Sequence, residues 1–142
     1  MTTQTVAPYP VRTHTMPHSM MVEVERDGMI NRGDLFSACL DPVVGSEQGG
    51  IRPVLVIQND VGNRYSPTVI VLAVTGQLGK ARRPTHVPIA CEGTGLVKDS
   101  VVLAEQIRTL DKRRLRERIG TLKPEVMARV GEAVKVSLGI KY

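Results

Sequence analysis

Short hydrophobic runs separated by polar, turn-forming residues dominate residues 29–110. Runs of this length, rich in Val, Ile, Leu and Thr, are typical of β-strands, and they predict strands at 32–40, 53–57, 68–75, 86–90 and 100–110. The run at 68–75 is nearly continuous in hydrophobic residues, which indicates burial on both faces of a sheet. Between the strands we expect a loop at 41–51, turns at 59–67 and 92–95, and a basic loop at 76–84.

The pattern changes in the last third of the chain. Residues 111–118 are basic and compatible with a helix, and residues 119–122 allow one more short strand. Pro124 suits the first position of a closing helix, in which Met127, Val130, Val134 and Leu138 recur at three- to four-residue spacing. Several strands followed by helices, without regular alternation, predict an α+β fold: a small antiparallel β-barrel with a C-terminal α-helix.

The chain of 142 residues has room for one domain. Residues 1–28 are rich in Thr, Pro, His and Met without a periodic hydrophobic pattern, so we expect a flexible N-terminal extension and a domain at 29–142. The extension lacks the apolar core of a secretory signal, and no hydrophobic run approaches the roughly 20 residues of a membrane span. We therefore expect a cytoplasmic protein that does not enter the membrane.

The formal net charge of +5 favours an anionic partner. One Phe, three Tyr and no Trp are too few aromatic rings for an RNA surface built on base stacking, so hydrogen bonds and cations would hold a nucleic acid here. The basic residues form two groups, at 80–83 and 108–118. The second is either a solvated helix face, the default for such a run, or a surface that steers phosphates.

Side chains that bind metal ions do not cluster in this sequence. Cys39 and Cys91 are not a C-x-x-C pair, no carboxylates recur at metal-binding spacing, and no Gly-rich phosphate-binding motif with Lys is present. We therefore expect no metal and no cofactor. An enzyme of this composition can still cleave RNA, with the substrate 2′-hydroxyl as nucleophile and a protein cation to stabilise the phosphorane.

The loop at 41–51 delivers a lone arginine, Arg52, to the start of a buried strand. Glycines beside it let the backbone approach a ligand, and Ser46, Glu47 and Gln48 add polar groups. Arg52 is thus a candidate phosphate ligand, with a solvated strand-end arginine as the alternative. Thr75 ends the most hydrophobic strand. It is a turn former on its own, and it becomes a candidate only if adjacent strands bring it to Arg52.

The strand at 100–110 carries polar residues in its second half. Gln106 and Arg108 share one face by the period of two, and Glu105 points to the other face unless the strand is bulged. These residues alone leave open whether Glu105 and Gln106 are structural or contact a ligand. His86 lies in a short strand without an evident partner, so we assign it no catalytic role.

Five segments together resemble the MazF/PemK family of toxin endoribonucleases, in that family's order and spacing: RGD at 32–34, PVVGSEQGGIRPVLVIQND at 42–60, SPTVIV…T at 66–75, PTHVPI at 84–89 and DSVVLAEQIRTLDKRRL at 99–115. The chain most resembles the branch of Gram-positive bacteria. The resemblance implies an SH3-like barrel, a homodimer, and metal-independent, sequence-specific cleavage of single-stranded RNA (mRNA) to 2′,3′-cyclic phosphate and 5′-hydroxyl ends. It also implies a MazE-like antitoxin partner with an acidic C-terminal segment.

By motif, Arg52 and Thr75 match the family's catalytic pair. Its RNA contacts correspond to Ser46, Glu47, Gln48, Ser100, Glu105 and Gln106, and Arg83 falls in a loop that varies between members. A gyrase-poisoning toxin of the same fold is one alternative, and it would need neither residue of the pair. A non-catalytic SH3-like RNA-binding module is the other. Incubation with RNA in the absence of divalent metal separates both alternatives from a nuclease.

Overall fold

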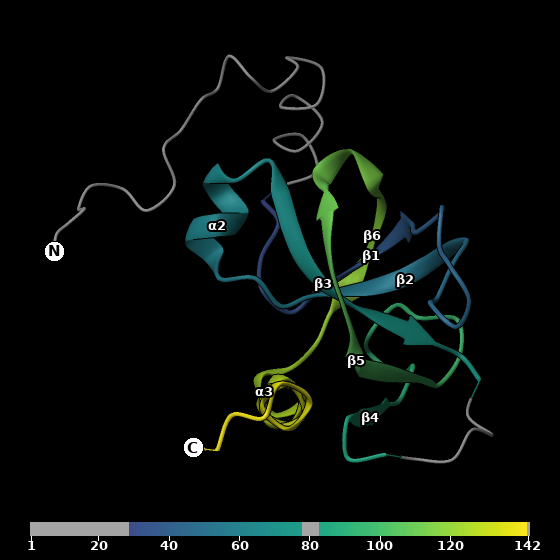
Figure 1. Cartoon of the computed structure of the whole chain (residues 1–142), viewed down its shortest axis with the longest axis vertical. Helices are drawn as coiled ribbons and strands as arrows, with labels where there is room; N and C mark the ends of the chain where they lie inside the picture. The colour runs from purple at the N-terminus through teal and green to yellow at the C-terminus, as the bar shows by residue number, and fades with distance from the viewer. Residues whose placement is uncertain (1–28, 78–82, 142) are drawn as a thin grey trace, which may run out of the picture.

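A computed structural model describes residues 29–77 and 83–141, so the predicted N-terminal extension lies outside the described residues. The elements (Figure 1) are β1 (Asp34–Cys39), β2 (Ile51–Val56), α2 (Asp60–Tyr65), β3 (Thr68–Thr75), β4 (His86–Ile89), β5 (Ser100–Asp111), the 3-10 helix η2 (Lys112–Arg114), β6 (Leu115–Thr121) and α3 (Pro124–Leu138). No helix in this described part is long and apolar enough to cross a membrane.

The strands form one antiparallel sheet in the order β4-β5-β3-β2-β1-β6. The closing helix α3 begins at Pro124, as predicted, and packs against β4 and β5 (Figure 1). An antiparallel sheet followed by a C-terminal helix is therefore confirmed. Within the described residues the two edge strands, β4 and β6, do not pair with each other, so strand pairing alone does not close a barrel.

Hydrophobic side chains fill both faces of the sheet. Adjacent residues of β2 pack on opposite faces. Leu55 belongs to a cluster that includes Val130 of α3, whereas Val54 belongs to a second cluster. In β3, Leu72 belongs to the first cluster and Val71 to the second. Burial on both faces thus explains the nearly continuous hydrophobic run of β3.

A bulge interrupts β5 where it runs beside β3. Leu72 pairs with Ile107, but the next residue of β3, Ala73, pairs with Leu103. Residues 104–106 of β5 therefore have no partner on β3. A bulge of this kind bends a strand and changes the direction of its side chains. The alternation of side chains between the two faces of the strand, expected for residues 105–108, is therefore not maintained through the bulge.

Residues 59–67, predicted as turns, instead contain the short helix α2. Asn59 caps the helix, since its side-chain oxygen accepts a hydrogen bond from Gly62 N at 2.8 Å. Asn63 is buried and exchanges hydrogen bonds with Gln58: its Nδ2 donates to Gln58 O (2.9 Å), and its Oδ1 accepts from Gln58 Nε2 (3.0 Å). The turn prediction was wrong because Asn and Gly, which are frequent in turns, here cap and fill a helix.

Residues 111–118, predicted to be compatible with a helix, are helical only over η2. From Leu115 the chain is extended and pairs with β1 as the edge strand β6, which also includes most of the short strand expected at 119–122. The ladder with β1 outweighs the weak helix preference of Arg and Glu. The result is a charged edge strand, which opposes association through the sheet edge.

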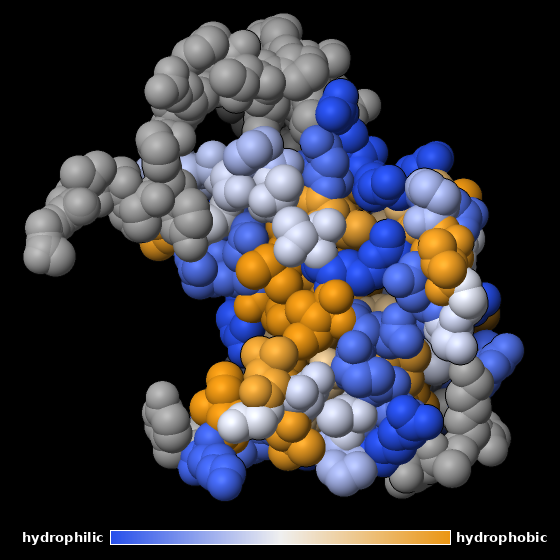
Figure 2. Space-filling view, viewed as in Figure 1, coloured by the Kyte–Doolittle hydropathy of each residue, from blue (hydrophilic) through white to orange (hydrophobic). Residues whose placement is uncertain are grey.

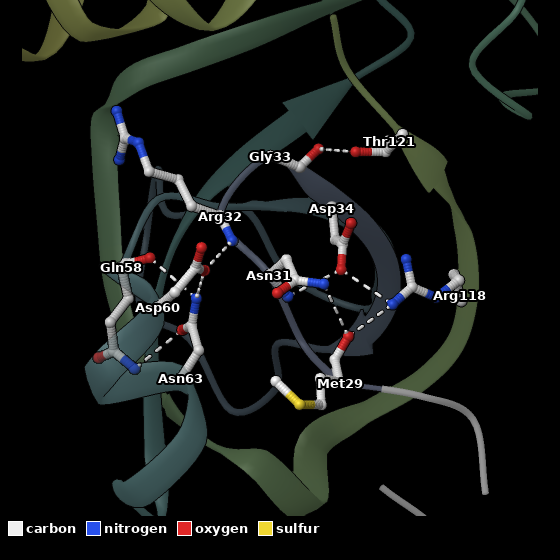
Figure 3. A network of polar contacts seen from close by, with 10 residues as sticks. All are labelled: Met29, Asn31, Arg32, Gly33, Asp34, Gln58, Asp60, Asn63, Arg118 and Thr121. Carbon is white, nitrogen blue, oxygen red and sulfur yellow. Dashed lines mark hydrogen bonds and ion pairs between the residues drawn. The ribbon is translucent and has the colours of Figure 1, made fainter. Parts of the chain in front are cut away.

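The Arg-Gly-Asp segment at 32–34 ties the start of the domain to β6 and α2 (Figure 3). Asp34 is buried, and its Oδ2 accepts a hydrogen bond from Asn31 N at 2.8 Å and lies 2.9 Å from Arg118 Nη2. Arg32 N donates to Asp60 Oδ1 of α2 at 2.7 Å. The segment therefore joins three elements, which is a structural role.

We predict that Arg118→Met destabilises the fold by about 1–3 kcal/mol, because the buried Asp34 carboxylate loses its charged partner. Chemical unfolding followed by circular dichroism measures this change. Arg116→Met on the same strand is the control, since Arg116 is exposed, and it should change the free energy of unfolding by less than about 0.5 kcal/mol. Equal effects of the two substitutions would contradict the importance of the ion pair.

Candidate active site

Arg52, the second residue of β2, lies at the end of the 41–51 loop. Its side chain is partly buried, and its Nε donates to Gly49 O at 2.9 Å, which fixes the direction of the guanidinium. A guanidinium anchored through Nε presents its two terminal nitrogens together. This is the geometry of a paired contact with a phosphate.

Thr75 stands opposite Arg52 when the register of β2 and β3 is continued. Val54 pairs with Ala73, and Arg52 and Thr75 lie two residues further along their strands, on the same face of the sheet. Thr75 is only 2% exposed, and its Oγ1 accepts a hydrogen bond from Gln77 N at 3.2 Å. The two predicted catalytic residues are thus brought to the same end of the β2–β3 pair, with Thr75 the deeper of the two.

A cleft of about 830 Å³ opens at this end of the sheet, and we call it the Arg52 cleft. Arg52 and Ser100 line it, together with residues from the 41–51 loop, the segment that follows β3, the segment at 95–98 and β6. Ser100 is buried, and its Oγ donates to Lys98 O at 3.0 Å. Gly76, the residue after Thr75, is also on the wall. The volume suits a ligand of the size that small-molecule sites hold.

A second cleft of about 390 Å³, the Glu105 cleft, is lined by the same loop together with β4 and β5. Its lining residues are Ser46, Gln48, Arg83, His86, Leu103, Glu105 and Gln106. Most of the predicted RNA contacts are therefore gathered here from separate segments. Gln48 Oε1 is buried and has no hydrogen-bond partner in the described part of the chain. A donor on a ligand would satisfy this acceptor.

Glu105 lies in the β5 bulge, and two residues of the 83–89 segment hold its carboxylate. Thr85 Oγ1 donates to Oε1 at 2.8 Å, and His86 Nε2 lies 3.1 Å from Oε2. Partial burial raises the pKa of Glu105, but hydrogen bonds from Thr85, the backbone and His86 outweigh it and lower the pKa below its usual value. Glu105 is therefore a fixed, ionised acceptor at neutral pH, suited to an amino group on a base.

Sequence reasoning assigned no role to His86, yet the structure places it in the Glu105 cleft. Its partner comes from β5, since His86 pairs with Leu103 in the ladder and Glu105 follows two residues later. No local pattern in the sequence could identify this contact. The bulge that turns Glu105 toward β4 is visible only in the paired strands.

Glu47 does not line either cleft. Its Oε1 accepts a hydrogen bond from Val44 N at 2.8 Å, and the side chain is exposed on the 41–51 loop. In the described structure it shapes a turn of the loop. It is the one predicted RNA-contacting residue that the fold does not bring to either cleft wall.

The basic residues at 108–118 are largely engaged within the protein. Four of them donate to backbone carbonyls: Arg108 Nη1 to Leu40 O (2.9 Å), Lys112 Nζ to Asn63 O (2.5 Å), Arg114 Nη1 to Cys39 O (3.1 Å) and Arg118 Nη2 to Met29 O (2.8 Å). Lys112 is buried, and burial lowers its pKa. The interpretation of this run as a solvated helix face is wrong, because its cations hold loops and strands together. In the 80–83 group, only Arg83 lies among the described residues.

Neither cleft gathers the ligands of a metal site. In residues 29–77 and 83–141, no three His, Cys, Asp or Glu side chains are placed to hold one metal ion. The lining of the Arg52 cleft instead includes three cationic residues, Arg52, Lys98 and Arg118, and one carboxylate, Glu117. The cleft can therefore supply positive charge to an anionic ligand from the protein itself.

Comparisons with known proteins agree on one family. The chain is 57% identical over 112 residues to "Endoribonuclease EndoA" of Bacillus subtilis (strain 168), an overlap of 79% of this chain and 97% of that protein. It is similar to the crystal structure of MazF from Deinococcus radiodurans (TM-score 0.69, 30% identity), covering 80% of this chain and 99% of that one. A MazE–MazF crystal structure from the same organism gives a TM-score of 0.64 at 29% identity, covering 81% of this chain and 100% of that one.

The family match extends over nearly the whole domain. Residues 31–138 match the family described as "PemK-like, MazF-like toxin of type II toxin-antitoxin system". This range includes both clefts and every predicted site residue. The chain therefore belongs to the PemK-like, MazF-like family of toxins of type II toxin–antitoxin systems.

Proposed function

We propose that this toxin is an endoribonuclease that cleaves single-stranded RNA, including mRNA, at specific sequences without a metal ion. The observation that carries the proposal is that Arg52 lines the Arg52 cleft at the same end of the β2–β3 pair as Thr75, beside a second cleft lined with polar groups. The relative from Bacillus subtilis, which is named as an endoribonuclease, supports the reaction class.

The proposed reaction uses the RNA as its own nucleophile. The 2′-hydroxyl oxygen attacks the adjacent phosphorus and passes its proton to water, and the bond from phosphorus to the 5′-oxygen breaks. The 5′-oxygen gains a proton, which leaves a 2′,3′-cyclic phosphate and a 5′-hydroxyl. Arg52 stabilises the charge on the phosphorane and is the proposed general acid, and the Thr75 hydroxyl positions the phosphate.

Sequence recognition is assigned to the Glu105 cleft. The ionised Glu105 accepts hydrogen bonds from a base amino group, while Gln48 and Gln106 supply amide donors and acceptors. Ser46 and Arg83 extend the same wall. We include Ser100 and Glu47 among the RNA contacts as well, the first on the wall of the Arg52 cleft and the second on the loop shared by both clefts.

An antitoxin is the proposed protein partner. Solved relatives include a MazE–MazF complex, and the net charge of +5 of this chain suits an acidic segment. We infer that the acidic C-terminal segment of a MazE-like antitoxin covers the clefts that hold RNA. Both partners then act in the cytoplasm, where messenger RNA is translated.

The two hydrophobic clusters support the prediction of an SH3-like barrel. α3 covers one face of the sheet, but the second cluster is built from the strands and the residues that flank them, including Phe36, Val54, Val71 and Leu110. A sheet buries such a face by curling over it. We therefore propose that the strands enclose this cluster as an SH3-like barrel.

A homodimer is proposed from the apolar surface between α2 and α3, which Figure 2 shows as a continuous orange area. Exposed hydrophobic residues of these two helices include Val61 of α2, which is 49% exposed, and Leu138 at the end of α3, which is 58% exposed. A contiguous apolar surface of this kind is typical of a subunit interface. A two-fold dimer also extends the RNA-binding groove beyond one small domain.

We predict that cleavage continues in excess EDTA and stops when the nucleotide on the 5′ side of the scissile phosphate carries a 2′-deoxy sugar. The reason is that the proposed mechanism takes its cation from Arg52 and its nucleophile from the substrate. Sequencing of 5′-hydroxyl ends in a transcript mixture first identifies the cleaved sites. Activity that disappears on chelation and returns with magnesium would refute this mechanism.

We predict that Arg52→Ala lowers the single-turnover cleavage rate by at least about 10²–10³-fold, the usual cost of one pre-organised donor. Arg52→Lys should restore little, because an ammonium cannot make the paired contact of a guanidinium. Arg129→Ala, at an exposed position of α3 outside both clefts, is the control and should cleave at the wild-type rate. Turnover by Arg52→Ala close to wild type would place the active site elsewhere.

We predict that light scattering at micromolar concentration gives twice the 15.5 kDa mass of one chain. Leu138→Asp should shift the protein toward the monomer, because it places a charge in the apolar interface. Val136→Asp is the matched control, since Val136 is 54% exposed on the opposite flank of the same helix, beside β4. A fully active wild-type monomer would exclude the dimer model.

A further inference from the structure

The side chain of Lys98 lies across the backbone at the end of β3. A Cβ atom added to Gly76 would stand 2.2 Å from Lys98 Cε and 3.1 Å from Nζ. The ammonium is therefore placed beside the residue that follows Thr75. Because Gly76 has no side chain, the lysine can pass this close to the strand.

The backbone on both sides of Lys98 is held in place. Ser100 Oγ donates to Lys98 O at 3.0 Å, and Asp99 Oδ1 accepts a hydrogen bond from Cys91 N at 2.9 Å. The carboxylate adjacent in sequence is thus engaged by the backbone of residue 91. None of the ion pairs found between described residues involves Lys98.

Lys98 shares the Arg52 cleft with Arg52 but comes from a different part of the fold. Arg52 enters from the start of β2, and Lys98 enters from the segment before β5. The third cation on the wall, Arg118, is committed to Asp34 at 2.9 Å and to Met29 O at 2.8 Å. Arg52 and Lys98 are therefore the cations on this wall that a bound phosphate can recruit.

We propose that Lys98 is a second catalytic cation, whose ammonium contacts the scissile phosphate opposite Arg52. The proposal rests on the proposed ribonuclease function. The phosphorane carries more negative charge on its non-bridging oxygens than the starting diester, so a second cation stabilises it more than the substrate. A guanidinium binds two phosphate oxygens in one fixed plane. An ammonium has no such plane, so it can contact another non-bridging oxygen as the geometry at phosphorus changes.

The test compares Lys98→Met, Lys98→Arg and the wild type on a transcript whose cleavage site has been mapped. Lys98→Met keeps the aliphatic chain over Gly76 and removes the charge. We expect its single-turnover rate at saturating RNA to fall at least about 10-fold. The affinity of Lys98→Met for the same RNA, made uncleavable by a 2′-deoxy sugar at the cleavage site, should fall by a smaller factor than the cleavage rate. Lys98→Arg should stay within about 3-fold of the wild-type rate, because it restores a cation at that position.

Lys123→Met is the matched control, since Lys123 is exposed before α3 and outside the Arg52 cleft. It removes the same charge and should leave the rate unchanged. A wild-type rate for Lys98→Met, in a protein whose thermal unfolding is unchanged, overturns the role of Lys98. Weaker binding with an unchanged rate at saturation also overturns it, because Lys98 would then contact a phosphate away from the reaction. Failure of the wild type to cleave any RNA would instead refute the proposed function.

Discussion

Burial of both faces of the β2–β3 pair holds the proposed site together. These two central strands place hydrophobic side chains alternately in the two clusters, so a slip of one residue would move each side chain into the other cluster and disrupt the packing of both. The register of this pair, in which Val54 lies opposite Ala73, brings Arg52 and Thr75 to the same end of the two strands, where the hydrophobic residues end. The relative position of the two polar groups is therefore fixed by packing several residues away from either one.

Long cationic side chains also stabilise the loop backbone near the site through hydrogen bonds to carbonyl oxygens. Arg108 donates to the carbonyls of Leu40 and Gln48, at 2.9 Å and 3.4 Å, and so joins both ends of the 41–51 loop to β5. This loop lines both clefts, and without such contacts its glycines would leave it with little preference for one conformation. Much of the positive charge that the sequence places near the site thus maintains its shape.

Particular elements show which features the sequence reveals. The strands and α3 were predictable because each buries a face with the period of its own secondary structure. The helix α2 and the strand β6 were missed because their conformations depend on partners distant from their own pattern, a buried Gln58–Asn63 pair and the ladder with β1. Arg52, Thr75 and the loop residues were predicted for the site through the motif, and they remain predictions. His86 was missed because its contact with Glu105 crosses between β4 and β5 at a bulge.

The β5 bulge also separates the residues proposed for base recognition from the residues that maintain the strand pairing. Residues 104–106 carry the groups assigned to base recognition, and because they have no partner on β3, a change there leaves the β3–β5 ladder on either side intact. Arg52 and Thr75, in contrast, depend on the register of the central strands. If these residues read the bases as proposed, substitutions in the bulge would change the base preference without moving Arg52 or Thr75.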